Sequence, residues 1–162
     1  MPTTVIYARV SSISDRQSTD RQVDDLTRYA KAMNYQILKV FQEKASGALK
    51  NGNRPVLLEC LKFCKDHHPD FLLISEISRL GRNTAEVLKT IQELSELKIS
   101  VYIQNLGLYT LTEDKKENPI TSMIVTVMAE MAKIERANIV YRLNSGRKRY
   151  IEKGGKLGRP EG

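Results

Sequence analysis

The sequence has no long hydrophobic run and no N-terminal export signal, and these absences exclude two classes of protein. No stretch of about 18 consecutive apolar residues occurs, so a membrane-spanning helix is not expected. The N-terminus has no basic segment followed by an apolar stretch and so does not resemble a secretory signal. With 162 residues, of which 41% are hydrophobic, the chain is long enough for one domain with its own core. A cytoplasmic location is the default expectation.

Cysteine and histidine are scarce, and they gather in one short segment. Cys60 and Cys64 lie four residues apart, just before His67 and His68, and this spacing weakly resembles a metal-binding cluster. The cysteines also share a helical stripe with neighbouring leucines, which favours reduced core residues. Histidines followed by Pro69 are typical of a helix C-terminus. We favour the core interpretation and expect no metal ion here.

The net charge of +7 is unevenly distributed along the chain. Nine basic and only three acidic residues lie from residue 131 onward, which places a net charge of +6 there and +1 on the first 130 residues. A nearly neutral domain followed by a basic arm is typical of nucleic-acid-binding proteins. The alternative is a solvated, charged helix face. The basic residues that we expect to contact DNA are Arg136, Arg142, Arg147, Lys148, Arg149 and Lys153.

Short apolar runs without internal glycine or proline alternate with helical patterns in the first two thirds of the chain. Such runs are typical of strands in a covered sheet. The alternation predicts an α/β fold with a central, mostly parallel sheet of about four to five strands and right-handed crossovers. A polar connector is expected over residues 105–118. The predicted strands are Thr4–Val10, Gln36–Phe41, Asp70–Ser75 and Ile99–Gln104.

Helices are expected between the strands, each with a recognisable first residue. Ser, Thr, Asp and Asn favour the position that caps a helix N-terminus, and proline suits the first turn. Candidate starts are Ser18, Thr19 or Asp20 for the first helix, Pro55 for the second, and Asn83 or Thr84 for the third.

A long helical pattern occupies residues 119–153, after an α/β domain over residues 1–118. At about 1.5 Å per residue it spans roughly 50 Å, more than a small domain can cover. Its first half is apolar nearly all round, so it needs partners on more than one side. We expect one face to lie on the α/β domain and another to meet a second copy in a symmetric homodimer. The expected dimer contacts are Met123, Val127, Met128, Met131 and Ile134.

Residues 154–162 are rich in glycine and basic residues, as flexible linkers are. We expect a further segment to follow such a linker.

Arginines and a serine follow the predicted strands at positions where α/β sheets bind ligands. Arg9 and Ser11 follow the first strand, Arg54 the second, and Arg79 and Arg82 the third. Arginine binds phosphate oxygens in a bidentate fork, and a well-placed donor typically contributes about 3 kcal/mol to a charged transition state. The set favours a serine nucleophile acting on a phosphodiester, although Ser11 could instead only begin a turn. These loops lack the dense Asp/Glu clusters that Mg²⁺ requires, so no metal is expected.

Five motifs in this order resemble the serine site-specific recombinases of the resolvase/invertase family, across essentially the whole chain. One such motif is weak, but five in register are specific. They are Tyr7-Ala8-Arg9-Val10-Ser11, Ala45-Ser46-Gly47, Arg79-Leu80-Gly81-Arg82, Ile134-Glu135-Arg136 and Leu157-Gly158-Arg159-Pro160.

The resemblance implies a three-layer resolvase-like domain, a long C-terminal helix and a separate C-terminal DNA-binding domain. It implies that Ser11 attacks double-stranded DNA at a specific site and forms a 5′-phosphoserine link within a tetramer. Because the link conserves the bond energy, no nucleotide cofactor is implied. Arg9, Arg54, Arg79 and Arg82 match the family's phosphate-binding arginines, and Gln22 matches a glutamine that helps to place the site. Glu135 and Arg136 match helix positions near the dimer interface and the DNA.

Two departures from the family pattern bear on the chemistry. The family often has Asp immediately before Arg-Leu-Gly-Arg, whereas this chain has Ser78. If that Asp assists proton transfer, Ser78 cannot act as an acid of similar pKa, and an arginine or a water must take the role. The segment from Ser11 to Gln22 is about two residues longer than in small resolvases, so the roles of Gln17 and Gln22 are not fixed by alignment.

Two other functions compete with recombination. A non-catalytic DNA-associating dimer of the same fold would keep the basic helix but would not need Ser11 or the arginines. A serine hydrolase would need a histidine near Ser11 and a Gly-x-Ser-x-Gly turn, and the sequence has neither.

Overall fold

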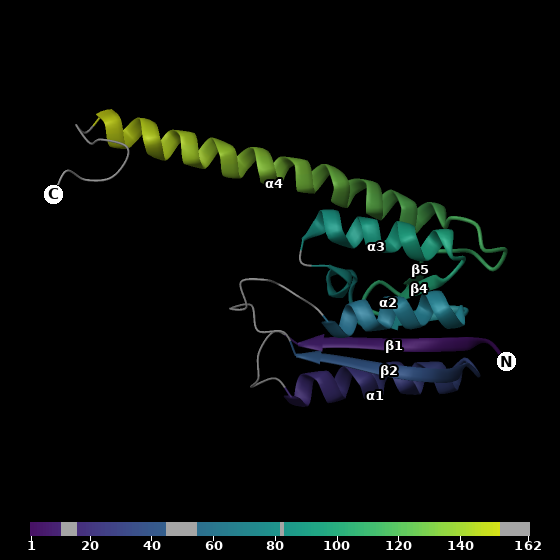
Figure 1. Ribbon diagram of the computed structural model, residues 1–162. Helices are drawn as coiled ribbons and strands as arrows, with labels where there is room; N and C mark the ends of the chain where they lie inside the picture. The colour runs from purple at the N-terminus through teal and green to yellow at the C-terminus, as the bar shows by residue number, and fades with distance from the viewer. Residues whose placement is uncertain (11–15, 45–54, 82, 153–162) are drawn as a thin grey trace.

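The computed structural model describes residues 1–10, 16–44, 55–81 and 83–152. Its centre is a five-stranded sheet with the order β2-β1-β3-β4-β5 (Figure 1). The first four strands run parallel and confirm the predicted parallel sheet. The strands are β1 (Thr3–Val10), β2 (Gln36–Lys44), β3 (Phe71–Ile74), β4 (Ser100–Ile103) and β5 (Leu108–Tyr109).

The fifth strand lies inside the segment expected to be a polar connector. β5 pairs antiparallel with β4 through Tyr109 opposite Tyr102 and Leu108 opposite Ile103. A two-residue strand gives too short a pattern for recognition from alternation. The polar connector expected over residues 105–118 therefore contains a strand that the sequence did not predict.

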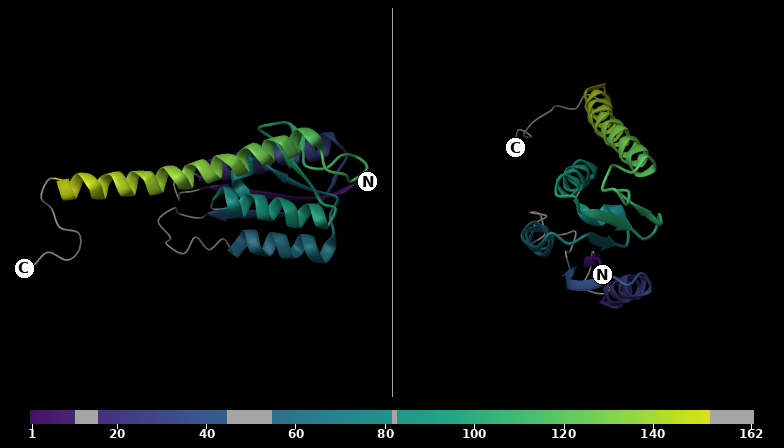
Figure 2. Two further views of the ribbon diagram at one scale, coloured as in Figure 1. Left: turned by 90° about the horizontal axis from the view of Figure 1, so that it is seen from above. Right: turned by 90° about the vertical axis from the view of Figure 1, so that its right-hand side faces the viewer.

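Helices cover both faces of the sheet and give the expected three-layer arrangement. Figure 2 shows α2 and α3 on one side of the sheet and α1 on the other. The helices are α1 (Arg16–Ala32), α2 (Pro55–His67), α3 (Thr84–Glu96) and α4 (Pro119–Glu152), with a short 3₁₀ turn, η2, at Ile77–Leu80.

The predicted helix starts are confirmed for α2 and α3 but not for α1. Pro55 is the first residue of α2. Asn83 caps α3, because its side-chain oxygen accepts a hydrogen bond of 2.9 Å from the backbone N–H of Glu86. α1 begins at Arg16, so the proposed caps at Ser18, Thr19 and Asp20 lie inside the helix.

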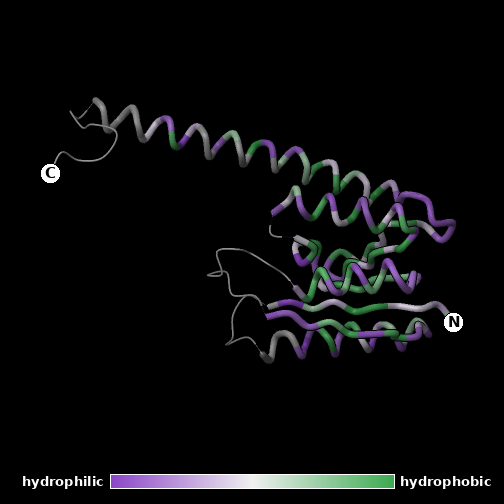
Figure 3. The backbone as a smooth tube through the Cα atoms, viewed as in Figure 1, coloured by the Kyte–Doolittle hydropathy of each residue, from purple (hydrophilic) through white to green (hydrophobic). Residues whose placement is uncertain are grey.

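The core is hydrophobic on both faces of the sheet. Figure 3 shows the hydrophobic colour concentrated along the central strands, whereas the helices alternate between hydrophobic and hydrophilic colours. Cys60 and Cys64 are fully buried between the sheet and α2, as expected of core residues. Their mutual hydrogen bond, together with burial, raises the pKa of the Cys60 thiol. His67 ends α2 as predicted, and its ring stacks on that of Phe63.

The described residues form neither a membrane-spanning helix nor a metal-binding cluster. No helix within these residues is long and apolar enough to cross a membrane. In the same part of the chain, no group of three or more His, Cys, Asp or Glu residues could hold a metal ion.

The long helix α4 confirms the predicted C-terminal helix and extends well beyond the α/β body (Figures 1 and 2). Its first turns pack on α3, and Val125 and Met128 contact the core cluster on that side of the sheet. Thr121 fixes the start of the helix by donating a hydrogen bond of 2.6 Å to the carbonyl of Tyr109. The free part of α4 projects past the carboxyl ends of the parallel strands.

Candidate functional site

The carboxyl edge of the sheet carries those predicted catalytic residues that the structure describes. Arg9 lies near the end of β1, Arg79 lies in η2 just after β3, and Gln22 lies on α1. The other predicted catalytic residues, Ser11, Arg54 and Arg82, lie outside the described residues.

Gln22 joins the ends of two neighbouring strands. Its side-chain oxygen accepts hydrogen bonds from the Arg9 N–H at 3.3 Å and from the Ser75 hydroxyl at 3.2 Å, and its amide nitrogen donates to the Arg9 carbonyl at 3.1 Å. A single side chain from α1 therefore holds the Arg9 backbone next to the segment that follows β3. The role of Gln22 in catalysis stays a prediction.

Arg9 presents a buried donor at this edge. Its Nε atom is buried and has no hydrogen-bond partner among the described residues. Buried polar groups in proteins are nearly always paired, and an arginine stays charged at all ordinary pH values. The site therefore offers a guanidinium suited to an anionic ligand such as a phosphate.

Beside Arg9, on the neighbouring strand, lies a buried acid that the sequence did not single out. Glu43 is only 2% exposed and is the register partner of Arg9 across β1 and β2. One of its carboxylate oxygens accepts a hydrogen bond from the Tyr7 hydroxyl, and the other is buried without a partner among the described residues. The prediction ended β2 at Phe41, whereas the strand continues to Lys44. Because strand residues two apart share a face, extending β2 would have placed Glu43 beside Phe41 and facing the core.

Arg79 is held by a compact turn. Its Nη2 atom lies 2.7 Å from the Glu76 carboxylate, and its backbone N–H donates to the Glu76 carbonyl at 3.1 Å. Leu80 is fully buried, and its carbonyl accepts a hydrogen bond of 3.0 Å from the Thr90 hydroxyl on α3. The turn is thus fixed to the domain core on the side of α3.

Gly81 explains part of the Arg-Leu-Gly-Arg motif. A Cβ atom at this position would lie 2.6 Å from the backbone nitrogen of Val87, far closer than side-chain atoms approach backbone. The glycine therefore lets the turn that carries Arg79 pack directly against the first turn of α3.

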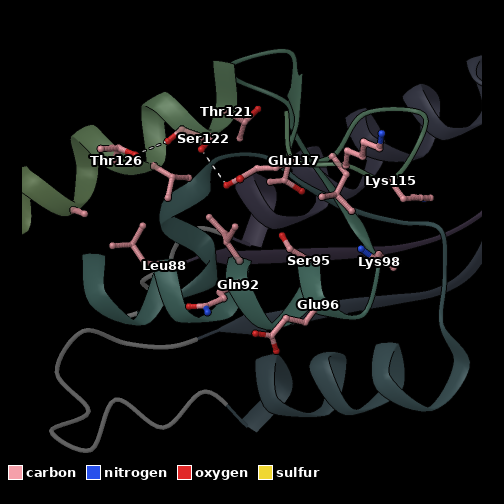
Figure 4. A pocket seen from close by; sticks show the side chains of 16 residues that line it. Leu88, Gln92, Ser95, Glu96, Lys98, Lys115, Glu117, Thr121, Ser122 and Thr126 are labelled. Atoms are coloured by element: carbon pink, nitrogen blue, oxygen red, sulfur yellow. Dashed lines mark hydrogen bonds between the residues drawn. The ribbon is translucent and has the colours of Figure 1, made fainter. Parts of the chain in front are cut away.

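A separate groove of about 770 Å³ lies between α3, the segment before α4 and the first turns of α4. Figure 4 shows Leu88, Gln92, Ser95 and Thr126 around it. The Ser122 hydroxyl donates a hydrogen bond of 3.0 Å to Glu117 at its upper rim. The described residues that line this groove include no predicted catalytic residue, so the chemistry is assigned to the carboxyl edge of the sheet rather than to this groove.

The predicted dimer contacts fall into two groups on α4. Met123, Val127, Met131 and Ile134 are each more than half exposed and follow one face of the helix. Met128 instead packs on the core of its own domain. The backbone of Glu135 lies in α4, and its side chain lies outside the described set.

Five of the six predicted DNA-contacting residues, all but Lys153, lie on the projecting half of α4. Arg142 is exposed. Lys153 lies outside the described residues, and for the others only the helical backbone is described, namely Arg136, Arg147, Lys148 and Arg149. Their contacts with DNA stay predictions.

Comparison with known proteins assigns the chain to a family. Residues 4–156 match the family described as the resolvase N-terminal domain. The chain is 36% identical over 157 residues to the transposon Tn917 resolvase of Enterococcus faecalis, which covers 95% of this chain and 74% of the relative. It is 32% identical over 153 residues to a resolvase/recombinase of Pseudomonas putida, which covers 94% of this chain and 76% of the relative.

A solved structure supports the fold. The crystal structure of a resolvase family site-specific recombinase from Streptococcus pneumoniae matches with a TM-score of 0.71 over 94% of this chain and 99% of that chain, at 22% identity. The chain therefore belongs to the resolvase family of serine recombinases and contains its N-terminal catalytic domain.

Proposed function

We propose that this domain cleaves and rejoins DNA at a specific recombination site, with Ser11 as the nucleophile. The observation that carries the proposal is made at Arg9, which Ser11 follows by two residues. The Nε atom of Arg9 is buried without a partner among the described residues, and Gln22 holds the Arg9 backbone at the carboxyl edge of the sheet. An anion at this edge would satisfy the donor, and a DNA phosphate is an anion with the right geometry for arginine.

In the proposed reaction the Ser11 oxygen forms a bond to phosphorus, and the bond between phosphorus and the DNA 3′-oxygen breaks. The serine proton leaves, and the released 3′-oxygen takes up a proton to become a hydroxyl. Arginines 9, 54, 79 and 82 stabilise the negative charge that grows on the phosphate oxygens. Attack by a 3′-hydroxyl on the phosphoserine reverses these steps and rejoins the DNA without a nucleotide cofactor.

The proposed assembly uses the two exposed surfaces of α4. The face formed by Met123, Val127, Met131 and Ile134 would pack against a second copy, because these apolar side chains lack cover in the described structure. The projecting basic half would follow the DNA backbone, so that affinity falls steeply with salt. Two such dimers form the proposed tetramer in which strands exchange.

The test uses the full-length protein and DNA that carries its recombination site with a nick beside the cleavage position. Wild-type protein should trap a covalent protein–DNA adduct, and Ser11→Ala should trap none. Ser12→Ala is the matched control, because it removes the neighbouring hydroxyl, and it should still form the adduct. If wild type and Ser11→Ala give equal adduct, or neither gives any, the mechanism is wrong. Binding without adduct in the wild type would favour a non-catalytic DNA-associating dimer.

A further inference from the structure

Ser78 leaves this chain without an acid immediately before Arg79, yet Arg79 has a carboxylate partner. Glu76 lies three residues before it, and its Oε1 atom lies 2.7 Å from Nη2 of Arg79. Ser78 is exposed. The acidic group beside this arginine therefore comes from the other end of the same 3₁₀ turn.

Helix capping does not explain a glutamate at this position. Glu76 occupies the N-cap of η2, where Ser, Thr, Asp and Asn are favoured because their short side chains reach the first N–H groups. Its side chain makes no capping hydrogen bond, whereas Asn83 at the next N-cap does. The longer glutamate side chain reaches the guanidinium instead.

Overall stability does not explain the pair either. The side chain of Glu76 is 40% exposed and that of Arg79 is 22% exposed, and ion pairs with such exposure contribute little to folding. The effect of the contact is local, because it restricts the rotation of one guanidinium.

The contact lies at the same edge as Arg9. β1 and β3 pair in parallel as far as Ile6 opposite Leu73. Both segments then continue toward this edge, β1 to Val10 and the chain after β3 to the N-cap of η2 at Glu76. The hydrogen bond from the Ser75 hydroxyl to Gln22, which also holds the Arg9 backbone, fixes the residue directly before Glu76.

We propose that Glu76 is a positioning residue that orients the Arg79 guanidinium for contact with the DNA phosphate, in place of an acid at position 78. A guanidinium has five N–H donors, so one carboxylate can hold it while it also binds a phosphate. The inference rests on the proposed function, because it assigns Arg79 to the phosphate.

The main test compares cleavage with binding in single-turnover reactions of the full-length protein on nicked site DNA. Glu76→Ala should slow adduct formation on the order of 100-fold, because a misplaced catalytic group loses about that much. DNA affinity should stay within about twofold or tighten, because the change removes a negative charge near DNA. Glu59→Ala removes an exposed glutamate on α2 and should change neither quantity.

A second variant separates positioning from a merely structural role. Adding Ser78→Asp to Glu76→Ala should restore adduct formation to within about tenfold of wild type, because it returns a carboxylate beside Arg79. Thermal melting checks that each variant is folded, and Glu76→Gln replaces Glu76→Ala if the latter does not fold. Wild-type rates in Glu76→Ala, or slow cleavage without rescue by Ser78→Asp, would overturn the proposal.

A spectroscopic readout keeps this inference distinct from the proposed function. Nitrogen NMR should show slow rotation of the Arg79 guanidinium in the wild type and faster rotation in Glu76→Ala, whether or not the protein cleaves DNA. Equal rotation in both would overturn the role of Glu76. Absence of a wild-type adduct with unequal rotation would instead overturn the role of Ser11.

Discussion

The two faces of the sheet differ in how completely their buried polar groups are hydrogen-bonded. On the side of α1, the hydroxyl of Tyr109 is hydrogen-bonded to both Tyr29 and Tyr35, and Tyr29 stacks on Tyr102. On the side of α2 and α3, one oxygen of the buried Glu43 has no partner among the described residues, and neither does the Arg9 Nε atom. Among the described residues, the buried polar side chains on the α1 face are hydrogen-bonded within the domain, whereas two buried polar atoms on the opposite face have no described partner.

We infer that the polar groups of the α1 face support folding, whereas those of the opposite face support binding and catalysis. Satisfied networks such as the tyrosine cluster rigidify a core, and their removal is expected to affect folding. Groups that stay unsatisfied cost stability and are kept where they bind or react. Changes on the two faces should therefore affect different properties of the protein.

The largest expected effect is on catalysis at Arg9. Arg9→Ala should lower adduct formation by roughly 10³-fold, the upper end of what a single donor to a charged transition state contributes. Urea unfolding should show stability unchanged or slightly raised, because the change removes a buried donor without a described partner. A large loss of stability would show that Arg9 stabilises the fold. It would contradict the inference that the unpaired groups on this face serve binding and catalysis.

An intermediate effect is expected at Tyr7, on the same face. Tyr7→Phe removes the hydroxyl that donates to Glu43, so the buried carboxyl group loses this hydrogen bond. The free energy of unfolding should fall by about 1–3 kcal/mol, as for other buried groups that lose a partner. Urea titration measures this loss, and Glu43→Gln in the same background should recover part of it. No recovery would mean that the hydroxyl supports something other than Glu43.

The smallest effect is expected on the tyrosine face. Tyr109→Phe should cost about 1 kcal/mol in unfolding free energy and leave adduct formation unchanged. Burial, followed by hydrogen bonds from Tyr29 and Tyr35, raises the pKa of Tyr109 well above its usual value. Its contribution to stability is therefore complete below pH ~10 and is lost at higher pH, where only the unfolded chain ionises. Urea titrations on both sides of pH 10 should show a weaker alkaline loss in Tyr109→Phe; an identical loss would contradict this assignment.

The sequence predicted the parallel strands, the long helix and the strand ends that carry Arg9 and Arg79, because each depends on a local pattern. Buried strands give apolar runs, and parallel strands bring their carboxyl ends to one edge. Asn83 and Pro55 were recognisable because their side chains act on the nearest turn.

Features set by tertiary contacts were not predicted. Glu43 meets Tyr7 through strand pairing and Glu76 meets Arg79 through the geometry of a turn. Neither contact produces a periodic sequence pattern, so neither glutamate was predicted to be a site residue. α1 starts at Arg16, before the caps proposed at Ser18, Thr19 and Asp20, because this segment contains several residues that favour capping and local preference alone does not choose among them. Ser11, Arg54 and Arg82 lie outside the described residues, so their geometry stays a prediction.

Because α4 packs on the α/β body near its start, a small tilt there moves its far end by a much larger distance. α4 contacts the α/β body through Thr121, Val125 and Met128, and the helix continues to Glu152. The remaining residues extend roughly 35 Å at about 1.5 Å each. A tilt of about 10° at the packed end would move the far end by roughly 6 Å, nearly two steps of about 3.4 Å along a DNA strand. The packing of Val125 and Met128 therefore determines how accurately the C-terminal half of α4 is positioned.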